Sequence, residues 1–353
     1  MKNIEKYLSL LDGEVDGLLL TSRYSRHYGA EFDIAEGVAI VTKAGCRYFT
    51  DSRYIESAQA GLRGFEVLDI AGVGYPKRLN DAIADFGVTT LGSEETYLTV
   101  AELQRYEKSL NAKLVPFNSR IYGFRAVKED WELDNMRRAQ AIADKAFAEV
   151  LPRVKVGMSE LELQAELIYC MYKNGAHGLS FDPIVVSGPN TSLPHGVAGE
   201  RKIREGDFIT MDFGVLYNGY CSDMTRTVAV GHATEEMEKV YYTVLEAQKA
   251  GLAATRAGVP GQDIDAAARK VIEDAGYGPY FGHGYGHSLG LEIHEGPNPN
   301  AFNAEPMPLH AVASAEPGIY LPGRFGVRIE DCVIYTEDGY ENLATSPKNL
   351  IIL

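Results

Sequence analysis

The chain of 353 residues lacks any hydrophobic run near the ~20 consecutive apolar residues that a membrane helix needs. It also has only four cysteines, none of them in a C-x-x-C pair, at positions 46, 170, 221 and 332. This scarcity argues against a disulfide framework or a cysteine-ligated zinc site and favours reduced, buried thiols. The start, MKNIEKYLSLLDGE, has no signal-peptide core. We therefore expect a cytoplasmic protein with no membrane partner.

Basic residues are also scarce, since 34 lysines and arginines face 49 aspartates and glutamates, for a net charge of −15. Nucleic-acid binding needs a basic face, and no run of lysine or arginine provides one. The first third contains no glycine-rich phosphate loop, and H-E-x-x-H, the motif of helical single-zinc proteases, is absent. We expect no nucleic-acid partner and no protease of that type.

The length favours two domains over one core. Residues 1–127 alternate strand-like and helical segments, which predicts an α/β N-terminal domain, with strands at 17–21, 37–42, 47–50 and 65–70. The pattern changes near residue 128, where a long helix is predicted over 131–151, followed by a second helix that opens with the capping box Ser159 and Glu162. We predict a second domain over 128–353.

A β-hairpin is predicted over residues 208–227, FITMDFGVLYNGYCSDMTRT, because strand-forming residues flank the turn pair Asn218-Gly219. In that register Asp212 and Asp223 lie diagonally across the ladder, on one face. Two ionised carboxylates in an apolar sheet repel each other unless a positive group lies between them. The hairpin therefore predicts either a shared cation or a proton-sharing pair.

A second hairpin, over 315–335, turns at LPGR and brings Glu316 close to a position opposite Glu330. A pseudo-two-fold arrangement would gather all four carboxylates, and oxygen-rich sites suit hard divalent ions. The glycine-rich stretch 282–295, GHGYGHSLGLEIHE, can present histidines to such a site. Each residue alone has an ordinary structural interpretation, so only the ordered set supports a metal site.

That ordered set resembles a known family. The motifs MDFG, SDMTRT, HGYGHSLGLEIHE, EPGIY and GVRIED are similar, in order and spacing, to those of the pita-bread metallopeptidases, which include methionine aminopeptidase, aminopeptidase P and proline dipeptidase. The resemblance covers 131–353, and the loop SGPNTSLPHG with the extra N-terminal domain resembles the proline-specific branch. It implies a creatinase-like α/β domain followed by an α+β pita-bread catalytic domain with a pseudo-two-fold antiparallel sheet.

The resemblance further implies two divalent metal ions, Mn²⁺ by preference with Co²⁺ or Zn²⁺ as alternatives. Its implied ligands are Asp212, Asp223, His287, Glu316 and Glu330. A metal-bridging hydroxide would attack the carbonyl carbon of the peptide bond that precedes proline. The other implied site residues are the general base Glu316 and the substrate-side residues His195, His283, His294 and Arg328.

The resemblance implies that substrate length is decided in the N-terminal domain and near the H-E-G-P segment. Proline dipeptidases often carry an arginine there for the free carboxylate of a dipeptide, whereas this chain has Asn298, a weaker carboxylate partner. We therefore favour an aminopeptidase P acting on longer peptides with proline second, and keep an Xaa-Pro dipeptidase as the alternative. A non-catalytic pita-bread binding protein and a creatinase-like metal-free hydrolase are disfavoured by the intact ligands. The resemblance also implies a homodimer.

The segment before Glu316 departs from the family pattern. The family usually has Gly-Met followed by β-branched residues there, whereas this chain has His310 to Ala315, HAVASA. We expect this departure to affect strand packing and to leave every ligand in place.

Overall fold

The computed structural model describes residues 2–353, and contacts divide the chain into two compact units, Met1–Phe124 and Arg125–Leu353. Arg125, the first residue of the second unit, forms ion pairs with Glu292 and Glu295 of the same unit.

The first unit is built on one mixed sheet with the strand order β4-β3-β2-β1-β5-β6. Its strands are β1 Gly17–Leu20, β2 Val38–Thr42, β3 Gly45–Thr50, β4 Glu66–Asp69, β5 Thr90–Ser93 and β6 Lys113–Pro116. Its helices are α1 Asn3–Ser9, α2 Arg23–Ala30, α3 Ile55–Gly61, α4 Gly74–Phe86, α5 Val100–Ser109 and α6 Asn118–Gly123. This is the α/β arrangement predicted from the sequence.

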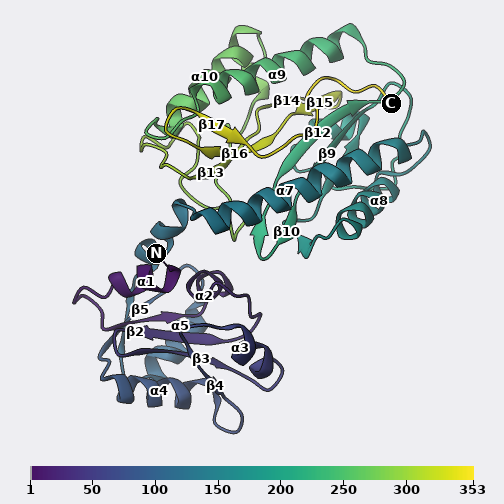
Figure 1. The fold of residues 1–353 in the computed structure, drawn as a ribbon. Coiled ribbons are helices and arrows are strands. Elements are labelled where there is room, and N and C mark those ends of the chain that lie inside the picture. The colour runs from purple at the N-terminus through teal and green to yellow at the C-terminus, as the bar shows by residue number, and fades with distance from the viewer. Residues whose placement is uncertain (1) are drawn as a thin grey trace. The chain divides into compact units, whose positions relative to one another are not determined.

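Helices cover the strands of the second unit on two sides (Figure 1). Helices α7 (Asp130–Val150) and α8 (Glu160–Lys173) pack with one set of strands, and α9 (Glu235–Ala254) and α10 (Gly261–Asp274) with the other, in two separate apolar clusters. Two of the helices begin where polar side chains cap them, because Ser159 accepts from the Glu162 amide and Thr234 from the Met237 amide. Short 3₁₀ turns lie at η1 Phe124–Ala126, η2 Leu151–Arg153, η3 Gly188–Ser192 and η4 Gly278–Tyr280.

The first predicted hairpin is present, with each arm interrupted. Its strands are β9 Phe208–Phe213, β10 Val215–Tyr217, β11 Tyr220–Cys221 and β12 Met224–Ala229, with β7 Gly178–Leu179 and β8 Ile184–Ser187 beside them. Asn218 and Gly219 form the two-residue turn with positive φ. The break lies at Gly214, where an added Cβ would come within 1.9 Å of the Ser222 carbonyl oxygen, so only glycine permits this approach.

The register of this hairpin gives Asp212 and Asp223 the relative positions that were predicted. Asp212 pairs with Thr225, so Asp223 lies diagonally across the ladder. Asp223 itself lies in the gap between β11 and β12. The interruption, which the sequence did not predict, frees its side chain from a regular ladder position.

The second hairpin repeats this design. Its strands are β13 Val312–Ala315, β14 Gly318–Leu321, β15 Phe325–Arg328 and β16 Asp331–Tyr335, with β17 Tyr340–Asn342 at the edge. Ala315 pairs with Asp331 and Gly318 with Arg328, so Glu316 and Glu330 lie opposite each other where both arms are interrupted. Thr225 joins the two hairpins, because its carbonyl accepts from the Glu330 amide at 3.1 Å and its hydroxyl donates to the Glu330 carboxylate at 2.6 Å.

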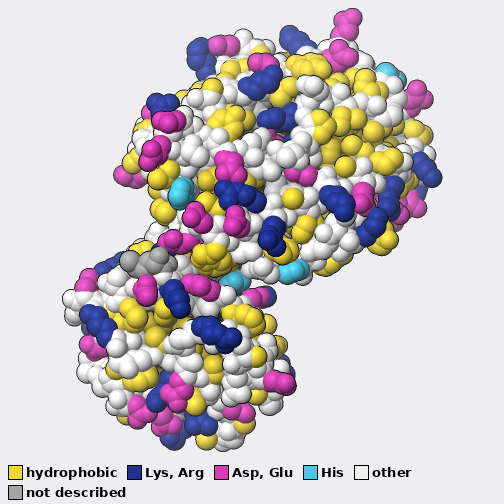
Figure 2. All heavy atoms as spheres, in the orientation of Figure 1, with side chains coloured by type: hydrophobic (Ala, Val, Ile, Leu, Met, Phe, Trp, Pro, Cys, Tyr) yellow, Lys and Arg dark blue, Asp and Glu magenta, His cyan; other side chains and the backbone are white. Residues whose placement is uncertain are grey.

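Among residues 2–353, no helix is long and apolar enough to cross a membrane. Basic and acidic side chains are interspersed on the visible face of each unit (Figure 2).

Candidate metal centre and active site

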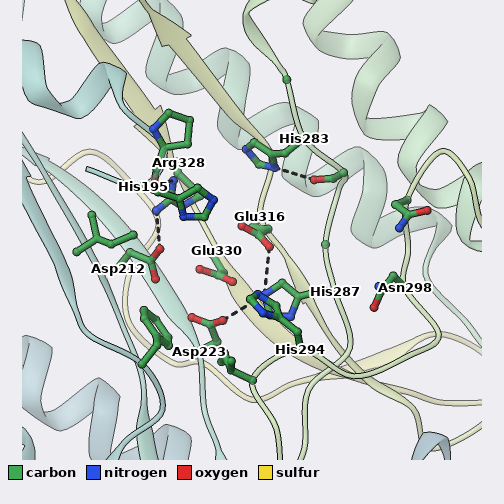
Figure 3. A pocket seen from close by; sticks show the side chains of 18 of the residues that line it. His195, Asp212, Asp223, His283, His287, His294, Asn298, Glu316, Arg328 and Glu330 are labelled. Atoms are coloured by element: carbon green, nitrogen blue, oxygen red, sulfur yellow. Dashed lines mark hydrogen bonds and ion pairs between the residues drawn. The ribbon is translucent and has the colours of Figure 1, made fainter. Parts of the chain in front are cut away.

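One cavity of about 930 Å³ in the second unit collects all of the candidate site residues. It lies between the two hairpins, the glycine-rich stretch and the loop that follows β8 (Figure 3). The candidates that line it are Asp212, Asp223, His287, Glu316, Glu330, His195, His283, His294 and Arg328. Segments up to 135 residues apart in the chain therefore contribute to one site.

The closest group of possible ligands consists of Asp223, His287 and Glu330, whose donor atoms lie within 4.8 Å of one another. Figure 3 shows His287 between Asp223 and Glu316, and its Nε2 is 3.4 Å from an oxygen of each. Asp212 lines the same cavity and forms an ion pair with Arg328. Four carboxylates and one imidazole thus surround a single space.

Three oxygens of this group have no hydrogen-bond partner among the described residues, although they are buried. They are Asp212 Oδ1, Asp223 Oδ1 and Glu330 Oε1. A buried acceptor without a partner costs ~1–3 kcal/mol, and more when it is charged, so native structures rarely leave one. Carboxylate oxygens with one imidazole form a donor set that suits divalent cations. These residues therefore fit a divalent metal centre.

The electrostatics of the group support this fit. Burial raises the pKa of Asp223 to about 7, and burial likewise raises the pKa of Asp212 and of Glu330, where the neighbouring carboxylates add to the effect. Burial alone would lower the pKa of His287, but its hydrogen bond to Asp223 and the charge of Glu316 raise that pKa to about 9. Each of these carboxylates is therefore costly to ionise in the buried cavity, and a bound cation would offset that cost.

His283 is held in one tautomer by a chain of hydrogen bonds. The carbonyl of Gly284 can only accept, so His283 Nδ1 donates to it at 2.8 Å, and Nε2 accepts from the Tyr320 hydroxyl at 2.9 Å. Tyr320 in turn accepts from Arg328 at 2.9 Å. Burial lowers the pKa of His283, which favours the neutral ring. With both nitrogens engaged, His283 forms a wall of the cavity and is not free to transfer a proton.

His294 has the opposite character. Its ring lies 4.4 Å from the His287 ring, edge to face, and neither of its nitrogens has a hydrogen-bond partner among residues 2–353. Partial burial, followed by the nearby His287, lowers the pKa of His294. The lowered pKa favours the neutral imidazole, whose N–H can donate a hydrogen bond to a carbonyl oxygen of a bound substrate.

The loop that carries His195 is held by a residue that the sequence interpretation missed. Glu160, fully buried in the first turn of α8, accepts from the Ser187 amide at 2.7 Å, from Asn190 at 3.0 Å and from the Gly199 amide at 3.1 Å. These contacts fasten both ends of the loop. Its position beside the predicted capping box made Glu160 look like an ordinary first-turn acid, so no local signal could have identified it.

A second missed pair supports the glycine-rich stretch. Asp265 and Arg269 of α10 form a two-point ion pair, and Arg269 donates to the carbonyls of Phe281 at 3.1 Å and His283 at 2.7 Å. Asp265 also accepts from the Tyr285 amide at 2.8 Å. The i, i+4 spacing of this oppositely charged pair was a signal that could have found it.

Comparisons with known proteins agree on one family. Residues 134–337 match metallopeptidase family M24, and residues 6–127 match the creatinase/prolidase N-terminal domain. An Xaa-Pro dipeptidase of Pyrococcus horikoshii is 32% identical, over 99% of each chain. Among solved structures, an Xaa-Pro dipeptidase from Bacillus anthracis is 41% identical with a TM-score of 0.96, over 100% of this chain and 99% of that one. An X-Pro aminopeptidase from Thermotoga maritima is 35% identical with a TM-score of 0.94, over 99% of each chain.

Proposed function

This chain belongs to metallopeptidase family M24 and is therefore a hydrolase, and we propose that it cleaves the peptide bond between an N-terminal residue and a proline at the second position. The family and the two-part fold predicted from the sequence are confirmed. The observation that carries the proposal is the complete set of four carboxylates and one histidine around a single cavity, in a chain whose full-length relatives are named for Xaa-Pro substrates.

The comparisons do not favour the aminopeptidase P interpretation over the dipeptidase alternative. The relatives include both Xaa-Pro dipeptidases and an X-Pro aminopeptidase, so the comparisons match the dipeptidase alternative as well as the favoured aminopeptidase P interpretation. Both activities break the same bond, and they differ in whether the chain may continue beyond proline. The proposal therefore covers Xaa-Pro peptides in general.

We assign the metal ligands to Asp212, Asp223, His287, Glu316 and Glu330, with two Mn²⁺ ions as the preferred occupants. This assignment is supported by the unpartnered buried oxygens and by the raised carboxylate pKa values. When bound, divalent ions lower the pKa of water so that hydroxide is available at neutral pH.

One of these ligands, Glu316, has a second proposed role, and the remaining residues are proposed to bind and orient the peptide. Glu316, which accepts from the Ser314 hydroxyl at 3.0 Å, is the proposed general base. His294 is proposed to donate to the carbonyl oxygen of the bond to be cleaved, and His195 and His283 to flank the proline. Arg328 donates to the Pro194 carbonyl at 3.1 Å and pairs with Asp212, so it couples the His195 loop to the ligand group.

A substrate panel tests this function directly. The purified chain is stripped of metal, resupplied with Mn²⁺, Co²⁺ or Zn²⁺, and assayed with Ala-Pro, Ala-Pro-Gly and a methionyl peptide without proline. We expect cleavage of at least one proline substrate and none of the methionyl peptide. Turnover in a sample verified as metal-free would contradict the metal mechanism, and preference for the methionyl peptide would assign the chain to another branch of the family.

We also propose that the active form is a homodimer. Sedimentation velocity at assay concentrations is expected to give twice the chain mass of 38.7 kDa. A sample that is monomeric and fully active would contradict this.

A further inference from the structure

Two loops at the cavity each present an apolar side chain almost completely to solvent. Phe302 is 95% exposed and Val197 is 87% exposed, and both line the cavity that contains the carboxylates. Exposed large apolar residues are common singly, but a pair facing one functional cavity is a feature of binding sites.

The loop of Phe302 is fixed by hydrogen bonds. The exposed position of the Phe302 ring is therefore set by the fold. The Phe302 amide donates to Asn300 Oδ1 at 3.0 Å, and the Asn303 side chain donates to the Asn298 carbonyl at 3.0 Å. Helix α10 fastens the same loop, because the Gln262 amide donates to the Asn303 carbonyl at 2.8 Å. The ring is therefore presented at low entropic cost.

Val197 is held in the same way. The Gly196 amide donates to the Leu193 carbonyl at 3.0 Å, and the Gly199 amide donates to the buried Glu160 at 3.1 Å. These bonds bracket Val197 on both sides. Two fastened loops therefore present one apolar side chain each to the same cavity.

Both side chains belong to loops that adjoin the residues proposed to flank proline. Val197 follows His195 by two residues. Asn300, two residues before Phe302, packs against the glycine next to His283, since a Cβ added at Gly284 would lie 2.8 Å from Asn300 Cβ. A peptide that continues beyond proline would leave the proposed proline position beside these two loops.

The charges of the cavity favour such a continuing peptide over a free dipeptide. Among the described residues that line it, the only lysine or arginine side chains are Arg269 and Arg328. Arg328 is paired with Asp212, and Arg269 with Asp265. The side-chain oxygen of Asn298 accepts from the Ser288 amide at 2.8 Å, so its neutral Nδ2 is the group left to donate to a carboxylate, and it is a weaker partner than a guanidinium. Among its described lining residues, the cavity therefore offers no unpaired lysine or arginine to a terminal carboxylate. It does offer apolar surface to a further side chain of the peptide.

From these observations we infer that Phe302 and Val197 form a subsite for an apolar residue immediately after proline, so that the preferred substrates are Xaa-Pro-Yaa peptides with a large apolar Yaa. The inference rests on the proposed Xaa-Pro activity and specifies its substrate class. An apolar side chain that covers Phe302 and Val197 removes their surface from water.

The test compares Ala-Pro-Leu-NH₂ with Ala-Pro-Gly-NH₂, which differ only in the third side chain and carry no terminal carboxylate. We expect kcat/KM to favour leucine by at least about tenfold, which is the lower end of what one buried methylene achieves in an apolar pocket. In the double variant Phe302→Ser, Val197→Ser, the ratio is expected to fall below about three. The control Val156→Ser removes a valine that is 61% exposed outside the cavity, and is expected to keep the ratio.

The possible outcomes distinguish failure of the proposed subsite from failure of the proposed Xaa-Pro activity. A wild-type ratio near one, with both amides hydrolysed, overturns the subsite and leaves the proposed function standing. Failure to cleave either amide or Ala-Pro with any of the three metals overturns the proposed function and the subsite with it. Sedimentation velocity is run on the same samples, and dissociation of the double variant from a wild-type dimer would assign the two side chains to contact with a second copy, which also overturns the subsite.

Discussion

Replacing Glu295 by glutamine should destabilise the second unit strongly, because this carboxylate balances two buried cations. It pairs with Arg125 and, at 3.2 Å, with Lys128 Nζ, and the three side chains are only 2–3% exposed. Glu292 pairs with Arg125 at 2.8 Å from a more accessible position. The four charges sum to zero in the wild type.

The substitution removes the carboxylate that pairs with both of these buried cations. Breaking a buried ion pair by removing one partner costs ~3–5 kcal/mol, since the remaining charge stays desolvated. We expect a loss of that size in Glu295→Gln. The matched control Glu341→Gln removes the partner of Arg137 at the surface, where both side chains are about 40% exposed, and should cost at most ~1 kcal/mol.

Urea unfolding followed by tryptophan fluorescence provides the measurement. Trp131 is the only tryptophan of the chain, and it lies in the second unit with its ring edge-to-face with that of Tyr220, 5.6 Å away. The signal therefore reports the unit that contains Glu295. A second substitution, Lys128→Met, should recover part of the loss by removing the excess cation, which appears as a coupling between the two sites.

The pH dependence gives a further check on the same residue. Burial would raise the pKa of Glu295, but Lys128 and Arg125 outweigh it and hold that pKa below the usual range. A carboxyl with a lowered pKa stabilises the folded state above its unfolded pKa of ~4.3, and loses this effect as the pH falls through the folded value. The advantage of the wild type over Glu295→Gln should therefore be complete near neutral pH and shrink in acid. A cost below ~1 kcal/mol at pH 7, equal to that of Glu341→Gln, would refute the reasoning.

Three other changes test the site. Asp223→Asn should reduce metal content and lower kcat/KM by at least about a hundredfold, measured by metal analysis and Xaa-Pro hydrolysis; unchanged metal content would contradict its assignment as a ligand. Chelation should abolish activity and lower the unfolding temperature, and Mn²⁺ should restore both, because a ligand that binds only the folded state stabilises it; an unfolding temperature insensitive to both treatments would count against the centre. Glu160→Gln should weaken the hydrogen bonds that hold the His195 loop, and should therefore raise KM more than it lowers kcat. The control is Glu200→Gln, at an exposed position. Equal kinetic constants for the two variants would show that the loop does not depend on Glu160.

The local chemistry of the chain was enough to predict the two hairpins and the helices α7 and α8. Asn218-Gly219 and the Pro-Gly turn demand tight reversals, and a reversal between strands sets the register, so the pairing of Asp212 and Glu316 with their partners could be worked out by counting residues. Helix α2 and strands β5 and β6 were not predicted, because they are short and carry no clear apolar periodicity.

The sequence by itself therefore determined which carboxylates share a hairpin, and the family resemblance added which histidines accompany them. Only the tertiary structure decided how the hairpins join through Thr225 and Glu330, which carboxylate oxygens are buried without partners, and where the arms are interrupted. It also decided the support of the site, because Arg125 and Glu295 are 170 residues apart and Glu160 lies 27 residues before Ser187. The physical reason is that turn and strand preferences act over a few residues, whereas burial and the partners of buried charges depend on which distant elements pack together.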